Sequence, residues 1–173
     1  KANICRSRCT SGAAERVFCG CKGIRQRYCL YFCFFMEDFI HLHVHTYYSL
    51  LDGQSSVQKL VDKAIGDGMR GMAITDHGNM FGIKEFYNYC NKVNGKLKKE
   101  GKEPFKPIFG CEMYVAHHRK EDKVKEHGDM GGYHLIVLAK NYKGYKNLIK
   151  LVSRAWVDGY YMRPRTDRAD LET

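Results

Sequence analysis

The chain has 173 residues, of which 44% are hydrophobic and 13% aromatic, so it is long enough and apolar enough for one domain with a buried core. No apolar run reaches the roughly 18–20 residues of a membrane span, and no membrane partner is expected. The formal net charge of +10 is uneven, because residues 1–35 hold seven Lys or Arg and one Glu, whereas residues 36–173 hold 22 Lys or Arg and 18 Asp or Glu.

Residues 1–35 differ in composition from the rest of the chain. They carry six of the eight cysteines but no histidine and no CxxC pair, so the spacing does not indicate a zinc module. A disulfide scaffold is the alternative. We expect instead that 1–35 is a Cys-rich leader outside the native fold, and that the domain occupies 36–173 with Met36 as its natural start. The six cysteines are Cys5, Cys9, Cys19, Cys21, Cys29 and Cys33.

The segment 39–46 reads Phe-Ile-His-Leu-His-Val-His-Thr, with a histidine at every second position. In a strand, this alternation puts His41, His43 and His45 on one face and apolar residues on the other. Neighbouring residues on one face have Cβ atoms roughly 6–7 Å apart, so the two rings can converge on one ion. The alternative is a solvated strand face without a ligand, and the downstream residues decide between the two.

Helices and strands are expected to alternate through the rest of the chain. Ser55 or Ser56 caps a helix with apolar residues at helical spacing, which Gly66 and Gly68 end. The further expected elements are a buried strand at 71–75, a helix over 81–97, strands at 107–115 and 133–139 separated by a polar loop at 117–132, a helix over 145–156, and a polar end at 159–173 without a further element.

This alternation is typical of βαβ units and predicts an α/β fold with a parallel sheet. About four strands are expected, which is enough for part of a barrel and too few to close one. In such sheets, ligands bind at the carboxyl ends of the strands.

Histidines and carboxylates recur at these predicted strand ends. His43 and His45 close the first strand, Asp52 follows in its loop, His77 follows the second strand, and Glu112 lies in the third. The remaining member, at the start of the fourth strand, is His134. Mixed imidazole and carboxylate ligands suit zinc, manganese or iron, and two or three such ions could activate a water and bind a phosphate oxygen.

Each signal also has an ordinary interpretation. Asp52-Gly53 is a common turn, Glu112 could be a solvated strand residue, and strand polarity alone would not bring His134 to the site. Three further histidines lie in the charged loop and are expected to be solvated, and the two late cysteines are expected to be reduced. These residues are His117, His118, His127, Cys90 and Cys111.

Five motifs, HLHVHT, SLLDG, ITDHGN, GCEMYV and YHLIVLAKN, occur in an order that resembles the PHP (polymerase and histidinol phosphatase) domain. More narrowly, together with the tail GYYMRPRTD, they resemble the N-terminal PHP domain of bacterial DNA polymerase III alpha subunits. The resemblance covers about 36–172 and implies a partial (β/α)7 barrel with a site for up to three divalent metal ions.

The positions that match the family's ligands are His43, His45, Asp52, His77, Glu112 and His134. Two further residues, His41 and Asp76, are expected to contact these ligands without binding metal themselves. Many relatives have Asp at the position of His41. The family's later ligands, including an Asp-x-His, have no counterpart in this sequence. The resemblance therefore implies an incomplete PHP domain that is catalytically poor alone.

For the parent protein, the resemblance implies DNA-templated DNA synthesis from deoxynucleoside triphosphates with magnesium, at carboxylates that match no residue here. It also implies a cytoplasmic replisome with a sliding clamp and a proofreading exonuclease subunit as partners. The PHP pocket itself could have 3′–5′ exonuclease chemistry. The alternatives are a free-standing PHP phosphoesterase, such as a histidinol phosphatase, and a structural PHP platform that docks the proofreading subunit.

Overall fold

A computed structural model describes residues 39–123 and 132–172, and our predictions for residues 1–35 and for His127 lie outside these ranges. The described part is mixed α/β. In the described ranges, no helix is long and apolar enough to cross a membrane. The elements are α2 (Val57–Gly66), β1 (Gly71–Ile74), α3 (Ile83–Lys99), β2 (Lys106–Val115), β3 (Tyr133–Leu138), α4 (Tyr142–Val157), β4 (Tyr160–Tyr161), β5 (Arg163–Thr166) and α5 (Arg168–Leu171).

Strand β2 is the centre of the sheet, and it is long enough to pair with three other strands. Its first half pairs with β1 in parallel, its second half pairs with β3 antiparallel, and its last two residues also pair with β5 in parallel. The expectation of a wholly parallel sheet is therefore wrong at β3. A parallel return needs a long crossover connection, usually a helix, and the described residues between β2 and β3 form none.

The predicted first strand, 39–44, is not a regular strand. It runs beside β1, because the Ala73 amide donates to the His41 carbonyl and the Thr75 amide donates to the Val44 carbonyl, both at 2.8 Å. The two donors are two residues apart on β1, whereas the two acceptors are three residues apart on this segment. The segment therefore has one extra residue, as in a β-bulge. The extra residue interrupts the ladder, and the side chain of Leu42 is half-exposed.

The helices form where the apolar spacing predicts them. Ser56 caps α2, its hydroxyl accepting from the Lys59 amide, and Asn141 caps α4 in the same way through the Gly144 amide. Phe81 begins the helix that the sequence predicts over 81–97, but in the structure it precedes α3 and is 67% exposed. The core around α2, β1 and α3 contains Val57, Val61, Ala64, Met72, Ile74, Ile83, Phe86, Cys90 and Phe105.

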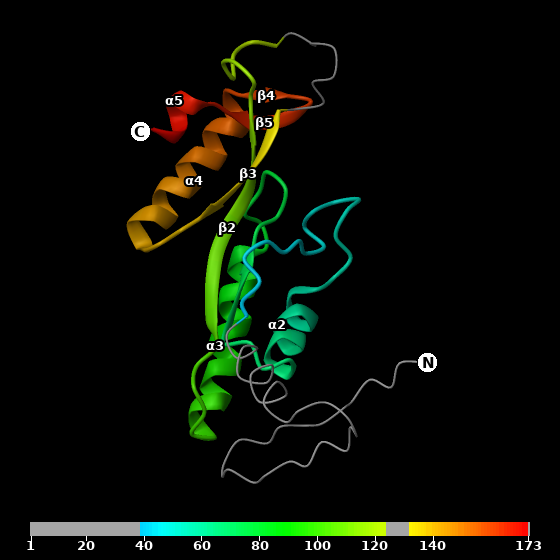
Figure 1. The fold of residues 1–173 in the computed structure, drawn as a ribbon, viewed down its shortest axis with the longest axis vertical. Coiled ribbons are helices and arrows are strands. Elements are labelled where there is room, and N and C mark those ends of the chain that lie inside the picture. Colours follow the sequence, from blue (N-terminus) through cyan, green and yellow to red (C-terminus); the bar gives the residue numbers. More distant parts are fainter. Residues whose placement is uncertain (1–38, 124–131, 173) are drawn as a thin grey trace, which may run out of the picture. The chain divides into compact units, whose positions relative to one another are not determined.

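A second core lies where α4 packs against the second half of β2, through Cys111, Met113, Leu148, Val152 and Ala155. In Figure 1, α4 accordingly lies beside one end of β2, and α2 and α3 lie beside the other. The polar end of the chain, where no element was expected, forms the β4–β5 hairpin and α5. The middle of β2, between the two cores, carries the candidate site.

Candidate metal centre

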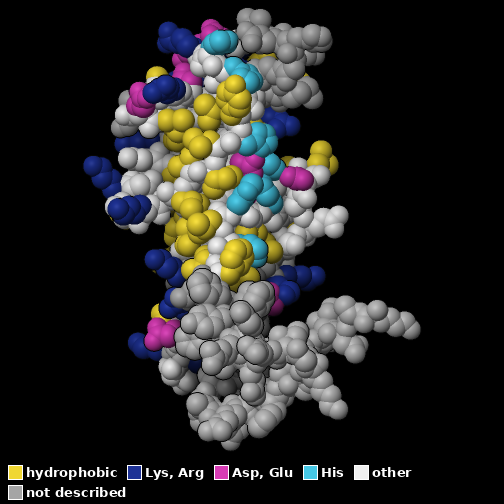
Figure 2. All heavy atoms as spheres, viewed as in Figure 1, with side chains coloured by type: hydrophobic (Ala, Val, Ile, Leu, Met, Phe, Trp, Pro, Cys, Tyr) yellow, Lys and Arg dark blue, Asp and Glu magenta, His cyan; other side chains and the backbone are white. Residues whose placement is uncertain are grey.

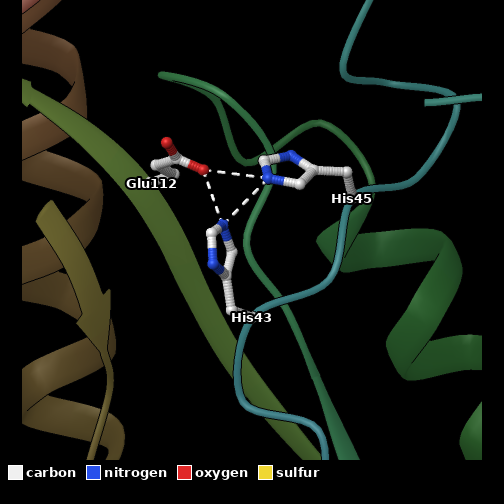
Figure 3. Close-up of side chains that lie close together, drawn as sticks. All are labelled: His43, His45 and Glu112. Atoms are coloured by element: carbon white, nitrogen blue, oxygen red, sulfur yellow. Dashed lines mark hydrogen bonds and ion pairs between the residues drawn. The ribbon is translucent and has the colours of Figure 1, made fainter. Parts of the chain in front are cut away.

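Glu112 lies at the middle of β2, and its side chain is only 3% exposed. Its Oε2 lies 2.7 Å from His43 Nε2 and 2.9 Å from His45 Nε2, and these two nitrogens are themselves 2.9 Å apart. Both histidines come from the segment beside β1, and in Figure 3 their rings point toward the Glu112 carboxylate. Three ligand atoms from two distant parts of the sequence thus converge on one point.

The other oxygen of Glu112 faces a second pair of histidines. Its Oε1 contacts His134 Nδ1 and lies 3.6 Å from His77 Nδ1. His134 reaches this place because β3 runs antiparallel to β2, which puts the start of β3 opposite Tyr114 near the end of β2. The strand polarity that made His134 difficult to place in a parallel sheet is thereby resolved.

His77 connects this pair to Asp52. It follows β1 and forms an isolated parallel bridge with Glu112, while its Nε2 lies 2.6 Å from Asp52 Oδ2. The rings of His45 and His77 stack with centroids 4.1 Å apart. His77 Nδ1 is buried and has no hydrogen-bond partner among the described residues, although it faces a carboxylate oxygen. A buried nitrogen without a partner, aimed at an oxygen just beyond hydrogen-bond distance, is suited to ligate a cation between them.

The six residues predicted as ligands lie together in the structure. They form three overlapping groups whose ligand atoms lie within 4.8 Å of one another: His43, His45 and Glu112; His45, Asp52 and His77; and His77, Glu112 and His134. Figure 2 shows histidines gathered along one face with acidic side chains among them. His41 belongs to none of these groups; it is exposed, and its ring contacts Phe39 edge-on. His117 and His118 are exposed and also outside these groups.

A buried chain of hydrogen bonds fixes the tautomer of His45. The Ser49 hydroxyl donates to Asp76 Oδ1 at 2.7 Å, so its oxygen must accept from His45 Nδ1 at 2.9 Å. His45 therefore carries its proton on Nδ1 and directs the lone pair of Nε2 at Glu112. The buried Asp76 carboxylate also accepts from the amide and hydroxyl of Thr46, which anchors the loop next to the ligand candidates. Hydrogen bonds of this kind orient metal-ligating histidines in general.

Three shifted pKa values, of one imidazole and two carboxyl groups, favour the protonation states that bind cations. Burial, together with the nearby His77, lowers the pKa of His45 below its ordinary value of 6.5. The pKa of Glu112 is lowered as well. Burial acts to raise it, but the hydrogen bond from His43 and the charges of the neighbouring His77 and His134 have the larger effect. The hydrogen bond with His77 likewise lowers the pKa of Asp52. Neutral imidazoles and ionised carboxylates are the ligating forms.

The donor set of four imidazoles and two carboxylates, without a thiolate, suits zinc, manganese or iron. Glu112 is buried, whereas the side chains of His43, His134 and Asp52 are between 45% and 61% exposed, so the site opens to solvent. Sequence reasoning assigned no role to Ser49, the first residue of the SLLDG motif, because only the fold places its hydroxyl between Asp76 and His45.

A comparison with protein families matches residues 41–173 to the PHP domain. Curated relatives include proteins described as DNA polymerase III subunit alpha from Borreliella burgdorferi (46% identical over 140 residues, 80% of this chain and 11% of the relative), Treponema pallidum (47% over 130 residues, 75% and 10%) and Thermus aquaticus (44% over 133 residues, 75% and 10%). The chain therefore spans about a tenth of the length of these relatives.

Proposed function

Because the chain belongs to the PHP domain family, we propose that residues 39–172 form the metal-binding PHP region of a bacterial DNA polymerase III alpha subunit. The observation that carries this proposal is the convergence of His43, His45, His77 and His134 on the two oxygens of one buried carboxylate, Glu112. A structural role for Glu112 alone would not require four imidazoles, or leave a buried ring nitrogen without a hydrogen-bond partner among the described residues.

The six ligand candidates would share two or three divalent ions, with Glu112 contributing one oxygen to each side of the site. Such ions, when bound, activate water and neutralise charge on a phosphoryl group. The chain's own contribution is to lower the pKa of the His45 imidazole, to fix its tautomer through Ser49, and to leave an open side for a substrate. Hydrolysis of a phosphodiester at the 3′ end of a DNA strand is the reaction that we assign to this site.

The wider setting is a further part of the proposal, and it rests on the resemblance to DNA polymerase III alpha subunits. We propose that the parent protein extends DNA on a template from deoxynucleoside triphosphates with magnesium, in the cytoplasm, beside a sliding clamp and a proofreading subunit. The polymerase carboxylates are assigned to no residue of this chain. In the parent, the sheet around β2 would continue into a (β/α)7 barrel that supplies further ligands, and we therefore expect the chain alone to hydrolyse slowly.

The ligand assignment is tested on the full 173-residue chain. His43→Ala/His45→Ala removes two of the three atoms of one group, and we expect the bound zinc or manganese to fall by at least half in elemental analysis after gel filtration. His118→Ala is the matched control, because it removes an exposed imidazole outside the three groups. Equal metal content in all three proteins would refute the assignment.

Two substrates and one binding assay separate the proposed reaction from its alternatives. A single-stranded oligonucleotide tests 3′ hydrolysis, histidinol phosphate tests a monoesterase, and binding of a proofreading subunit tests a structural platform. We expect the parent protein to shorten the oligonucleotide and to lose this activity in a chelator. Release of phosphate from the monoester alone would favour the phosphatase, and docking without either hydrolysis would favour the platform.

A further inference from the structure

Arg163 lies at the rim of the metal centre, outside the groups of ligand candidates. It begins β5, and its guanidinium carbon lies 4.7 Å from the centre of the Tyr114 ring. Its Nη1 lies 3.5 Å from Nε2 of His134, whose other ring nitrogen contacts Glu112. No carboxylate within the described ranges forms an ion pair with it. A cation is therefore held beside the site, and the described residues provide no anionic partner for it.

The Tyr114 ring makes this position rigid. It is 6% exposed, lies parallel to His77 at 6.0 Å between centroids, and meets His134 edge-on at 4.9 Å. Stacking on an aromatic face limits the rotamers of an arginine and leaves the edge of its guanidinium free to donate. The buried Tyr114 ring thus holds Arg163 next to two of the ligand candidates, His77 and His134.

Arg165, in the same hairpin, has a structural role and serves as a comparison for Arg163. Its residue is 2% exposed, and its guanidinium donates to the carbonyls of Lys120 and Asp122 at 3.0 and 3.1 Å. Arg163, two residues earlier and on the same side of the strand, makes no such backbone contacts in the described structure and is partly exposed. The hairpin therefore uses one arginine for packing and presents the other to the site.

The contact with His134 leaves further donors of Arg163 available within the described ranges. Its Nη1 lies 3.5 Å from His134 Nε2, at the outer limit of hydrogen-bond distance, and a guanidinium carries five N–H donors. A planar guanidinium matches the oxygens of a phosphate group, which can accept two parallel hydrogen bonds from it.

Resting on the proposed function, we infer that Arg163, aligned by Tyr114, binds a phosphate oxygen of the substrate beside the metal centre. Its role is to position the substrate, because it donates to the phosphate and takes no part in proton transfer. The phosphate could belong to a phosphodiester or to a monoester, which share this chemistry.

The test compares Arg163→Gln, Arg163→Lys and the control Arg168→Gln in the full chain. Arg168 has the same charge, and its side chain is 90% exposed and pairs with Glu172 on α5. Loss of one charge-assisted hydrogen bond should weaken the binding of inorganic phosphate about tenfold or more in Arg163→Gln, with a smaller loss in Arg163→Lys, which keeps the charge but not the planar fork. Arg168→Gln should bind like the unchanged chain.

Isothermal titration with inorganic phosphate, with manganese and again in chelator, gives the affinity, and elemental analysis gives the metal content. A fluorescent single-stranded oligonucleotide identifies the source: parallel loss in Arg163→Gln indicates a phosphodiester, and loss for inorganic phosphate alone indicates a monoester. Equal losses in Arg163→Gln and Arg168→Gln, or no phosphate binding by the unchanged chain in either condition, overturn the inference. A chain without metal whose phosphate binding still depends on Arg163 would overturn only the proposed function.

Discussion

The substitution Ser49→Ala tests whether the hydrogen-bond chain behind the ligands sets the affinity for metal. The Ser49 hydroxyl is buried, donates to Asp76 at 2.7 Å, and accepts from His45 at 2.9 Å and from the His77 amide at 3.2 Å. Its removal leaves a buried carboxylate with one donor fewer and an imidazole N–H without its acceptor. The expected loss is about 2–3 kcal/mol of unfolding free energy, or a fall of roughly 5–10 °C in Tm for a chain of this size.

The same substitution releases the His45 tautomer, so the affinity for zinc or manganese should fall about 10- to 100-fold. Ser56→Ala is the control, because it deletes the cap of α2 and should cost about 1 kcal/mol without touching the site. Thermal unfolding in chelator gives the stabilities, and metal titration well below both Tm values gives the affinities. Ser49→Ala binding metal as tightly as Ser56→Ala would refute the role assigned to this hydroxyl.

Two further predictions follow from the shifted pKa values. Because the pKa of His45 is lowered in the folded chain, the unfolded chain binds more protons below pH 6.5, and the free energy of unfolding should therefore decrease as the pH is lowered below 6.5. Thermal unfolding in chelator between about pH 7.5 and pH 5.5 measures this decrease. The substitution His45→Gln should make the free energy of unfolding less dependent on pH in this range. Burial raises the pKa of Cys90 and of Cys111 to about 12, so iodoacetamide at about pH 8 should label neither thiol until the chain unfolds, as peptide mass spectrometry would detect.

Local sequence signals were sufficient to predict α2, α3 and α4 and to select the six ligand candidates that the fold brings together. The helical spacing after Ser56 predicted α2, and the apolar run at 71–75 predicted β1, because both elements bury one continuous apolar surface. The ligand candidates could be found because polar residues directly after buried strands collect at one edge of a sheet, and His77 is the clearest case. These inferences need only the position of a residue relative to its own element.

The features that escaped prediction depend on distant parts of the chain. The direction of β3 is set by the path of the chain after β2, and the bulge opposite β1 by the exchange of hydrogen bonds between two segments. The β4–β5 hairpin was not predicted, because the sequence Arg163, Pro164 and Arg165 is typical of a polar loop. Arg165 is buried only because the carbonyls of Lys120 and Asp122 satisfy its guanidinium, which no local pattern indicates.

The place of Glu112 links the candidate metal centre to the stability of the fold. A buried carboxylate is costly unless partners compensate it, and here the partners are histidines from the segment beside β1, from the end of β1 and from β3. These imidazoles meet only in the folded chain, so a cation that they bind stabilises the folded state over the unfolded state. Each tenfold excess of free cation over Kd adds about 1.4 kcal/mol of stability. A substitution that weakens one ligand therefore lowers both metal affinity and the metal-dependent part of the stability.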